Sequence, residues 1–545
     1  MKKLTIIFIF FFSVSLLTFH VSHIYSQQPT LEWVKRYPDS VYSHGAVGYA
    51  MALDSDGNLY VTGSYASISV TSVCTIKYSP GGEPLWVNNF TGTNIGNRQA
   101  YAVAVDKNSN VYISGTSYNP GSSYDYCTIK YDSKGAQQWV QYYSGPSGGD
   151  DYVQKIAIDN ANNIYVTGCS SAGGMVDFQI ATIKYTPDGR QIWVKRYGTN
   201  DATTYANGIA VDDDCNIYIT GSNNDSAVTI KYDSSGVQQW AKSYTGNSGL
   251  LSQANSIVLD IENNIYITGY SYGVSGTSEH IDFFTVKYSS NGIQDWAKRY
   301  NPDSATYDSK YVANTVKVDN LGDVYVSGFF EPNEGSSGKL CTIKYSINGD
   351  LLWVQKDTSR LSNETTIMAI DKYNCIYVNG SYATLSNNGT IATIKYNSSG
   401  SVMWKEVYIG AYAFDILVDE NINIYLTGYG LGGMVTLKYS QPIGIQSISS
   451  EIPGTFKLFQ NYPNPFNPTT KIKFSLPNPS KGGALEIKLI VYDLPGRVIA
   501  TLVNENLKPG EYETEWNASN FASGVYFYQL QAGTFRESKK MLLIK

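Results

Sequence analysis

Short runs of alternating apolar and polar residues fill the middle of the chain and predict β-strands. Representative runs are Ala102–Val105, Asn163–Thr167, Ala181–Tyr185 and Trp193–Tyr197, which are rich in β-branched and aromatic residues. Asp- and Asn-rich segments such as Asp54–Asn58 have the composition of tight turns between strands. The pattern therefore predicts an all-β protein made of short antiparallel strands.

These strands recur as one repeating unit. A segment resembling Asn-Ile-Tyr-Val-Thr-Gly occurs eight times, and an Asp lies six residues before each of its tyrosines. The eight tyrosines are Tyr60, Tyr112, Tyr165, Tyr218, Tyr266, Tyr325, Tyr377 and Tyr425. A second segment, resembling Thr-Ile-Lys-Tyr, follows each of them, and in seven cases a Trp comes eight residues after its Tyr. Four strands repeated at about 50 residues are the sequence signature of a β-propeller.

The two ends of the repeat array complement each other. Trp33 begins a fourth strand that no third strand precedes, while Tyr439 ends a third strand that no Trp follows. We therefore expect Leu31–Tyr37 to supply the outer strand of the last blade, which closes the ring and leaves no long free sheet edge. The prediction is an eight-bladed β-propeller of four-stranded blades spanning residues 27–441.

The repeated phrases resemble the SBBP β-propeller repeat found in secreted bacterial proteins. The resemblance rests on Ala-Val-Asp, Asn-Ile-Tyr-Val-Thr-Gly, Ala-Thr-Ile-Lys-Tyr and Trp-Val-Lys-Arg-Tyr, which recur in register over about three quarters of the chain. It implies a fold and no particular activity.

The N-terminus has the three-part layout of a secretory signal peptide. Met1–Lys3 is basic, Leu4–Phe19 is apolar apart from Thr and Ser, and the more polar His20–Ser26 follows. A spanning helix needs about 20 apolar residues, and this run is shorter. We predict cleavage after residue 26, with no transmembrane segment in the mature chain.

The repeat stops after residue 441, and we expect residues 442–452 to form a linker and residues 453–545 a separate domain. Six short strand-like runs in this tail predict an immunoglobulin-like β-sandwich. The tail also resembles the type A C-terminal sorting domain of the type IX secretion system, through Asn461–Pro468, Val491–Arg497, Gly524–Leu530 and Lys539–Lys545. The resemblance implies the type IX machinery as a partner and a protein that is secreted, either extracellular or attached to the outer cell surface.

Composition and the absence of catalytic motifs exclude several classes of function. The net charge of −6 argues against binding nucleic acid through phosphate neutralisation. His44 and His280 are the only histidines beyond residue 26, and no hydrolase, zinc or phosphate-loop motif occurs. We therefore predict no catalytic, cofactor-binding or metal-binding residues.

The repeated turns and side chains also have a structural interpretation. Asp54–Asn58 begins like a calcium loop but lacks its terminal Glu, so a hairpin turn is the better interpretation. The repeated Lys and Trp residues are interpreted as packing groups, the Lys meeting an acidic partner.

Two classes of function remain. The first is a non-enzymatic binding, adhesion or structural propeller, and the second is an enzyme similar to the eight-bladed quinoproteins, whose blades also carry a Gly-then-Trp hairpin. That family uses a disulfide between neighbouring cysteines and a calcium-bound quinone, whereas no two cysteines here are adjacent. Cys74, Cys127 and Cys341 share one strand position, which favours buried thiols. We expect the non-enzymatic class.

Connection lengths locate a candidate binding face. The Asp-to-Tyr and Tyr-to-Trp spacings are constant, whereas the connection between second and third strands varies from Gly221–Thr229 to Gly269–Thr285. In an antiparallel blade these two kinds of connection emerge on opposite faces, and specificity usually resides in loops on a rigid scaffold. The longest loop, Tyr270–Phe284, is therefore the candidate site for an unidentified glycan or protein. Its candidate residues are Tyr272, Glu279, His280 and Asp282.

Overall fold

The computed structural model describes residues 28–545, with internal gaps. The gaps are residues 39–44, 68–69, 93–95, 120, 122, 174–176, 200–202, 247–248, 276–277, 303–308, 333–336, 358, 360, 383–388, 431, 442–445, 450–451, 479–484, 508 and 519–520. The predicted signal peptide, residues 1–26, and part of the predicted linker lie outside the described residues. All regular elements that the structure describes are strands, and among these residues no helix is long and apolar enough to cross a membrane.

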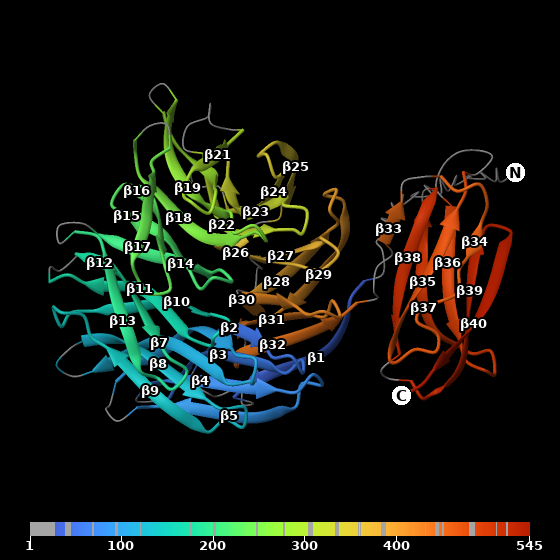
Figure 1. Ribbon diagram of the computed structural model, residues 1–545, viewed down its shortest axis with the longest axis horizontal. Coiled ribbons are helices and arrows are strands. Elements are labelled where there is room, and N and C mark those ends of the chain that lie inside the picture. The colour runs from blue at the N-terminus through green and yellow to red at the C-terminus, as the bar shows by residue number, and fades with distance from the viewer. Residues whose placement is uncertain are drawn as a thin grey trace, which may run out of the picture.

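Thirty-two strands form a ring of four-stranded antiparallel units (Figure 1). Units one and two comprise β2 (Ala46–Leu53), β3 (Leu59–Ala66), β4 (Thr71–Tyr78), β5 (Pro84–Phe90), β6 (Arg98–Val105), β7 (Val111–Asn119), β8 (Ser123–Tyr131) and β9 (Gln137–Tyr143). Units three and four comprise β10 (Asp151–Ile158), β11 (Ile164–Ser171), β12 (Phe178–Tyr185), β13 (Gln191–Tyr197), β14 (Thr204–Val211), β15 (Ile217–Asn223), β16 (Ser226–Tyr232) and β17 (Gln238–Tyr244).

The second half of the ring repeats this order. Units five and six comprise β18 (Ser252–Leu259), β19 (Ile265–Ser275), β20 (Ser278–Tyr288), β21 (Gln294–Tyr300), β22 (Lys310–Val318), β23 (Val324–Glu331), β24 (Lys339–Tyr345) and β25 (Leu351–Asp357). Units seven and eight comprise β26 (Leu361–Ile370), β27 (Ile376–Tyr382), β28 (Thr390–Tyr396), β29 (Val402–Ile409), β30 (Ala411–Val418), β31 (Ile424–Gly430), β32 (Gly433–Ser440) and β1 (Thr30–Tyr37). The first strands of successive units contact one another and form the innermost part of the ring.

The N-terminal strand closes the ring. β1 pairs antiparallel with β32, as in the register Arg36 with Val435, so the last unit combines three strands from one end of the array with one from the other. This confirms the predicted pairing of Leu31–Tyr37, and with it the all-β propeller fold.

The repeated Asp and Tyr build one recurring turn. In unit three, Asp159 Oδ1 accepts hydrogen bonds from the amides of Ala161 and Asn163, at 2.9 and 2.8 Å. Its Oδ2 accepts from the Asn163 side chain and the Tyr165 hydroxyl, both at 2.8 Å. Burial alone raises the pKa of the Asp159 carboxyl, but these donors bring it below its ordinary value. The Tyr-to-Asp bond occurs in every unit.

The repeated Lys and Trp join each unit to the next. Lys184 Nζ lies 5.1 Å from the centre of the ring of Tyr165 and donates to the carbonyl of Ser234 in unit four, at 2.9 Å. Trp193 Nε1 donates to the same carbonyl at 3.4 Å. A Cβ added at Gly236 would lie 3.0 Å from the Trp193 ring, so a glycine lets the turn approach the indole. The interpretation of these residues as packing groups is confirmed, as is the acidic partner of Lys77, whose Nζ lies 3.3 Å from Asp54 Oδ2.

At the ring closure a side chain replaces the missing turn. Unit eight has no turn between β32 and β1, and the chain continues to Gln441. Gln441 Oε1 accepts from Lys395 Nζ at 3.1 Å and from Trp404 Nε1 at 3.3 Å, so it takes the place of the turn carbonyl. Its amide nitrogen donates to the Tyr377 hydroxyl at 2.5 Å and to the Ile422 carbonyl at 2.8 Å.

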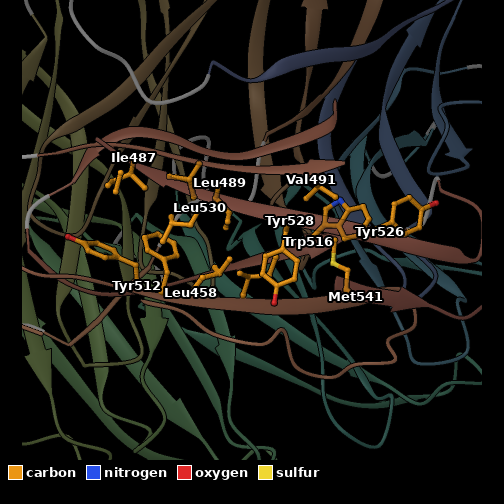
Figure 2. Close-up of a cluster of buried hydrophobic side chains, with 14 of the residues drawn as sticks. Leu458, Ile487, Leu489, Val491, Tyr512, Trp516, Tyr526, Tyr528, Leu530 and Met541 are labelled. Carbon is orange, nitrogen blue, oxygen red and sulfur yellow. The ribbon is translucent and has the colours of Figure 1, made fainter. Parts of the chain in front are cut away.

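The C-terminal part consists of two four-stranded antiparallel sheets around one core. The first contains β33 (Gln446–Ser449), β38 (Gly510–Asn517), β35 (Thr469–Leu476) and β34 (Lys457–Leu458); the second contains β37 (Val498–Leu507), β36 (Leu485–Tyr492), β39 (Gly524–Ala532) and β40 (Phe535–Leu543). Figure 2 shows Trp516 and Tyr528 among the buried side chains of this core. β33 lies within the predicted linker and pairs with β38, so residues 446–449 contribute a strand to this part.

Candidate functional site

The segment Tyr270–Phe284, predicted to be a loop, is a long β-hairpin instead. β19 and β20 each have 11 residues, and their pairing continues through Tyr272 with Ile281, Gly273 with His280 and Val274 with Glu279. The extra residues therefore lengthen the two strands, because their backbone groups continue the same antiparallel ladder. We call the face of the ring that carries this hairpin, and the other connections between second and third strands, the varied face. The opposite face, which carries the Asp-containing turns between first and second strands, is the uniform face.

An ion pair between Arg299 and the buried Asp282 holds the hairpin to its own unit. Arg299, on β21, places one terminal nitrogen 2.5 Å from Asp282 Oδ2 and 3.3 and 3.2 Å from the carbonyls of Ser271 and Tyr272. In unit three, Arg196 occupies the corresponding position, with Gln179 in place of Asp282, and it also donates to two carbonyls at the end of the second strand. Asp282, predicted as a ligand residue, therefore anchors the hairpin through Arg299.

His280 packs against this anchor. Its side chain is 7% exposed, and Nε2 lies 3.4 Å from Asp282 Oδ1. A Cβ added at Gly273, its partner across the hairpin, would lie 2.4 Å from His280 Nε2, so only glycine leaves room for the imidazole. His280 Nδ1 is buried and has no hydrogen-bond partner among the described residues, which is unusual for a buried polar atom.

A cavity of about 190 Å³ opens beside the hairpin between units five and six. Tyr272, Glu279, His280 and Ile281 line it from the hairpin, and Ser309, Lys310 and Glu331 line it from the next unit. The two units meet here because Ile281 and Lys310 form a parallel bridge between β20 and β22. Glu279 is exposed and Tyr272 is half-buried, so both are accessible from the varied face.

The structure thus brings three of the four predicted residues, Tyr272, Glu279 and His280, to the lining of one cavity. Asp282 is not part of this lining and pairs with Arg299 instead. Sequence reasoning missed Ser309, Lys310 and Glu331. They belong to another repeat, and no spacing within one repeat reveals which residues of the next unit lie beside its hairpin. Within the described part of the chain, no group of three or more His, Cys, Asp or Glu side chains could hold a metal ion.

A second group of charges lies on the innermost strands. Asp415, on β30, accepts a hydrogen bond from the Met51 amide at 2.7 Å, and it interacts electrostatically with Lys155 and Lys317 on two other units. Burial raises the pKa of the Asp415 carboxyl to about 6, although the amide donors and the two lysines act in the opposite direction. The same burial lowers the pKa of Lys317. This carboxyl therefore titrates near neutral pH.

The fold and its surfaces define the class of protein as a β-propeller followed by a smaller two-sheet part. Comparison with protein families finds a match within each of these two parts. Residues 460–545 match the family "Secretion system C-terminal sorting domain", and residues 138–173, 192–225 and 239–274 match "Beta-propeller repeat". The resemblances to the SBBP repeat and to the type IX sorting domain are thereby confirmed.

Individual relatives are more distant. An "Uncharacterized WD repeat-containing protein L264" of Acanthamoeba polyphaga mimivirus is 25% identical over 269 residues, which are 47% of this chain and 14% of that protein. Among solved structures, the Dos1 propeller has a TM-score of 0.47 at 11% identity, covering 76% of this chain and 95% of that one. The polysaccharide lyase Uly1 has a TM-score of 0.39 at 9% identity, with coverages of 74% and 91%.

Proposed function

We propose that this protein is an exported, non-enzymatic β-propeller that binds an extracellular glycan or protein at the hairpin cavity of its varied face. The observation that carries the proposal is the unpartnered, buried Nδ1 of His280 in a side chain that lines this cavity. A buried polar atom without a partner costs free energy, on the order of 1–3 kcal/mol, which a ligand hydrogen bond would offset. Glu279 and Lys310 give the cavity charges of both signs.

We propose that export carries this cavity out of the cell. The sorting domain at residues 460–545 indicates passage through the type IX machinery. We propose that the mature protein is either released or held at the outer cell surface, with the propeller as the part that meets the ligand. Binding residues on extended connections of a rigid ring are the common arrangement for such scaffolds.

The quinoprotein alternative has less support. The Gly-then-Trp hairpin that suggested it serves to pack one unit on the next, as Gly236 does for Trp193. The six cysteines are free thiols, four of them buried, and no two are adjacent in sequence. An ultraviolet–visible absorption spectrum of the purified protein tests this alternative directly, because a bound quinone absorbs in this range.

The proposal is tested by screening the mature chain against glycan and extracellular-protein arrays, followed by variants of the cavity. Glu279→Gln and His280→Ala should each weaken the binding of any ligand found by about tenfold, as expected for the loss of one polar contact with the ligand. Glu420→Gln, an equally simple change at an exposed residue of the uniform face, is the matched control and should leave binding unchanged. Equal binding by all variants, or binding lost only in Glu420→Gln, would contradict the proposal.

A further inference from the structure

Three charged side chains from three separate units meet on the inside of the ring. Lys155 on β10, Lys317 on β22 and Asp415 on β30 belong to units three, six and eight, and these strands lie on the inside of the ring (Figure 1). No two of these units are neighbours, yet each of the three charges interacts electrostatically with the other two. These interactions reach across the inside of the ring, so the three side chains converge there.

The carboxylate is held by backbone amides and not by the lysines. Asp415 Oδ2 accepts from the Met51 amide of unit one at 2.7 Å, and its Oδ1 accepts from the Ile416 amide at 2.8 Å. Among the described residues, neither Lys155 nor Lys317 makes a hydrogen bond or an ion pair through its amine. The three groups together carry one excess positive charge, and burial lowers the pKa of Lys317. Since Lys155 is exposed and Lys317 is half-buried, both amines are accessible to a small solute.

Lys155 occupies a strand position at which two other units carry an acceptor. Asp415 and Ser256 directly follow the bulges of their first strands, and each accepts from an amide of the next unit, Ser256 Oγ from that of Val316 at 3.3 Å. Lys155 follows the bulge of β10 in the same register, and a lysine has no acceptor. The amide of Ile209, which corresponds in unit four to that of Val316, therefore receives no acceptor from this side chain.

We propose that the inside of the ring binds one small oxyanion, a phosphate, sulfate or carboxylate, between the amines of Lys155 and Lys317. An oxyanion has two or more acceptor oxygens, so it can bridge amines that come from different units and form charge-assisted hydrogen bonds with both. The bond from the Met51 amide to Asp415 shows that carboxylate oxygens fit the amides of this wall, and an anion beside Lys155 can accept from the Ile209 amide in the same way. The site is separate from the hairpin cavity and does not depend on the function proposed for it.

Calorimetric titration of the mature chain with sodium sulfate, phosphate and succinate, in a constant background of sodium chloride, tests the proposal. At least one of these anions should bind in a saturable one-to-one manner. Lys155→Met and Lys317→Met keep a long side chain without its charge, and each should weaken binding by about tenfold, as expected for one charge-assisted contact. Asp415→Asn removes the competing negative charge but keeps an oxygen for the Met51 amide, so it should strengthen binding. Circular dichroism spectra and melting temperatures check that each variant is folded.

Two control variants locate the binding. Lys107→Met removes an exposed lysine from a turn of the uniform face and should leave binding unchanged. His280→Ala should also leave it unchanged, which separates this site from the hairpin cavity. The proposal is overturned if none of the three oxyanions binds, if chloride at the same concentration displaces them, if the Lys155→Met and Lys317→Met double variant binds as well as the original chain, or if Lys107→Met weakens binding equally. Weaker binding by a folded Asp415→Asn chain would overturn it as well.

Discussion

Gln441 closes the ring by replacing a backbone turn with its side chain, and this makes Gln441→Ala a sensitive test of the closure. The substitution removes four hydrogen bonds, to Lys395, Trp404, Tyr377 and the Ile422 carbonyl. Three join neutral groups at about 0.5–1.5 kcal/mol each, and the bond from the lysine is charge-assisted at about 1.5–3 kcal/mol. The residue is 8% exposed, so water replaces these bonds poorly. We expect a loss of at least about 3 kcal/mol in the free energy of unfolding, which is the lower end of the sum of these bonds.

Urea unfolding of the mature chain, followed by tryptophan fluorescence, measures this loss. Eight of the nine tryptophans lie in the repeats, so the signal reports on the ring. Gln355→Ala is the matched control, because Gln355 makes one such bond, to the Gly400 carbonyl at 2.9 Å, and should cost about 1 kcal/mol. If Gln441→Ala costs no more than Gln355→Ala, the described closure is wrong.

Three other predictions concern stability and export. Trp193→Ala should cost about 3–5 kcal/mol in the same urea assay, because the indole is 9% exposed and packs between Tyr165 and Tyr232; a cost below about 1 kcal/mol would mean that it does not carry inter-unit packing. In the folded chain the pKa of the Asp415 carboxyl is about 6, whereas the pKa of an Asp in an unfolded chain is about 3.9. Stability should therefore fall as pH rises from about 4 to about 6, and Asp415→Asn should flatten that part of the profile, an unchanged profile arguing against this assignment. Deletion of residues 453–545 should leave the protein in the periplasm in cell fractionation, and its appearance outside the cell would refute the role of the tail.

The architecture could be predicted from the sequence because each repeat contains the residues that form its own turns and strand pairs. Asp159 and Tyr165 lie six residues apart and meet across one turn. Local spacing of this kind predicts strands and turns well. The ring closure was equally predictable, since an unpaired strand at one end of the array matched a missing strand at the other.

The site was less predictable for two physical reasons. Connection length identified Tyr270–Phe284 as unusual but could not distinguish a loop from longer strands, because both leave the constant spacings unchanged. The contacts that define the cavity join different units, because Lys310 of unit six lies beside Ile281 of unit five. Such contacts depend on how neighbouring sheets pack, which no single repeat encodes.

The most direct test of the proposed binding site exchanges the hairpin itself. Tyr270–Phe284 is replaced by Ser222–Val228, the short connection of unit four, together with Arg299→Ser. Unit four has Ser243 at the position of Arg299, so the exchange leaves no arginine without its carboxylate. Ligand binding, measured on the array hit by surface plasmon resonance, is compared with that of the original chain and of Lys107→Ala and Glu420→Gln on the uniform face. We expect the exchange to abolish binding of the array ligand while the chain remains folded and the uniform-face variants bind normally. Binding that survives the exchange, or is lost only in the uniform-face variants, would contradict it.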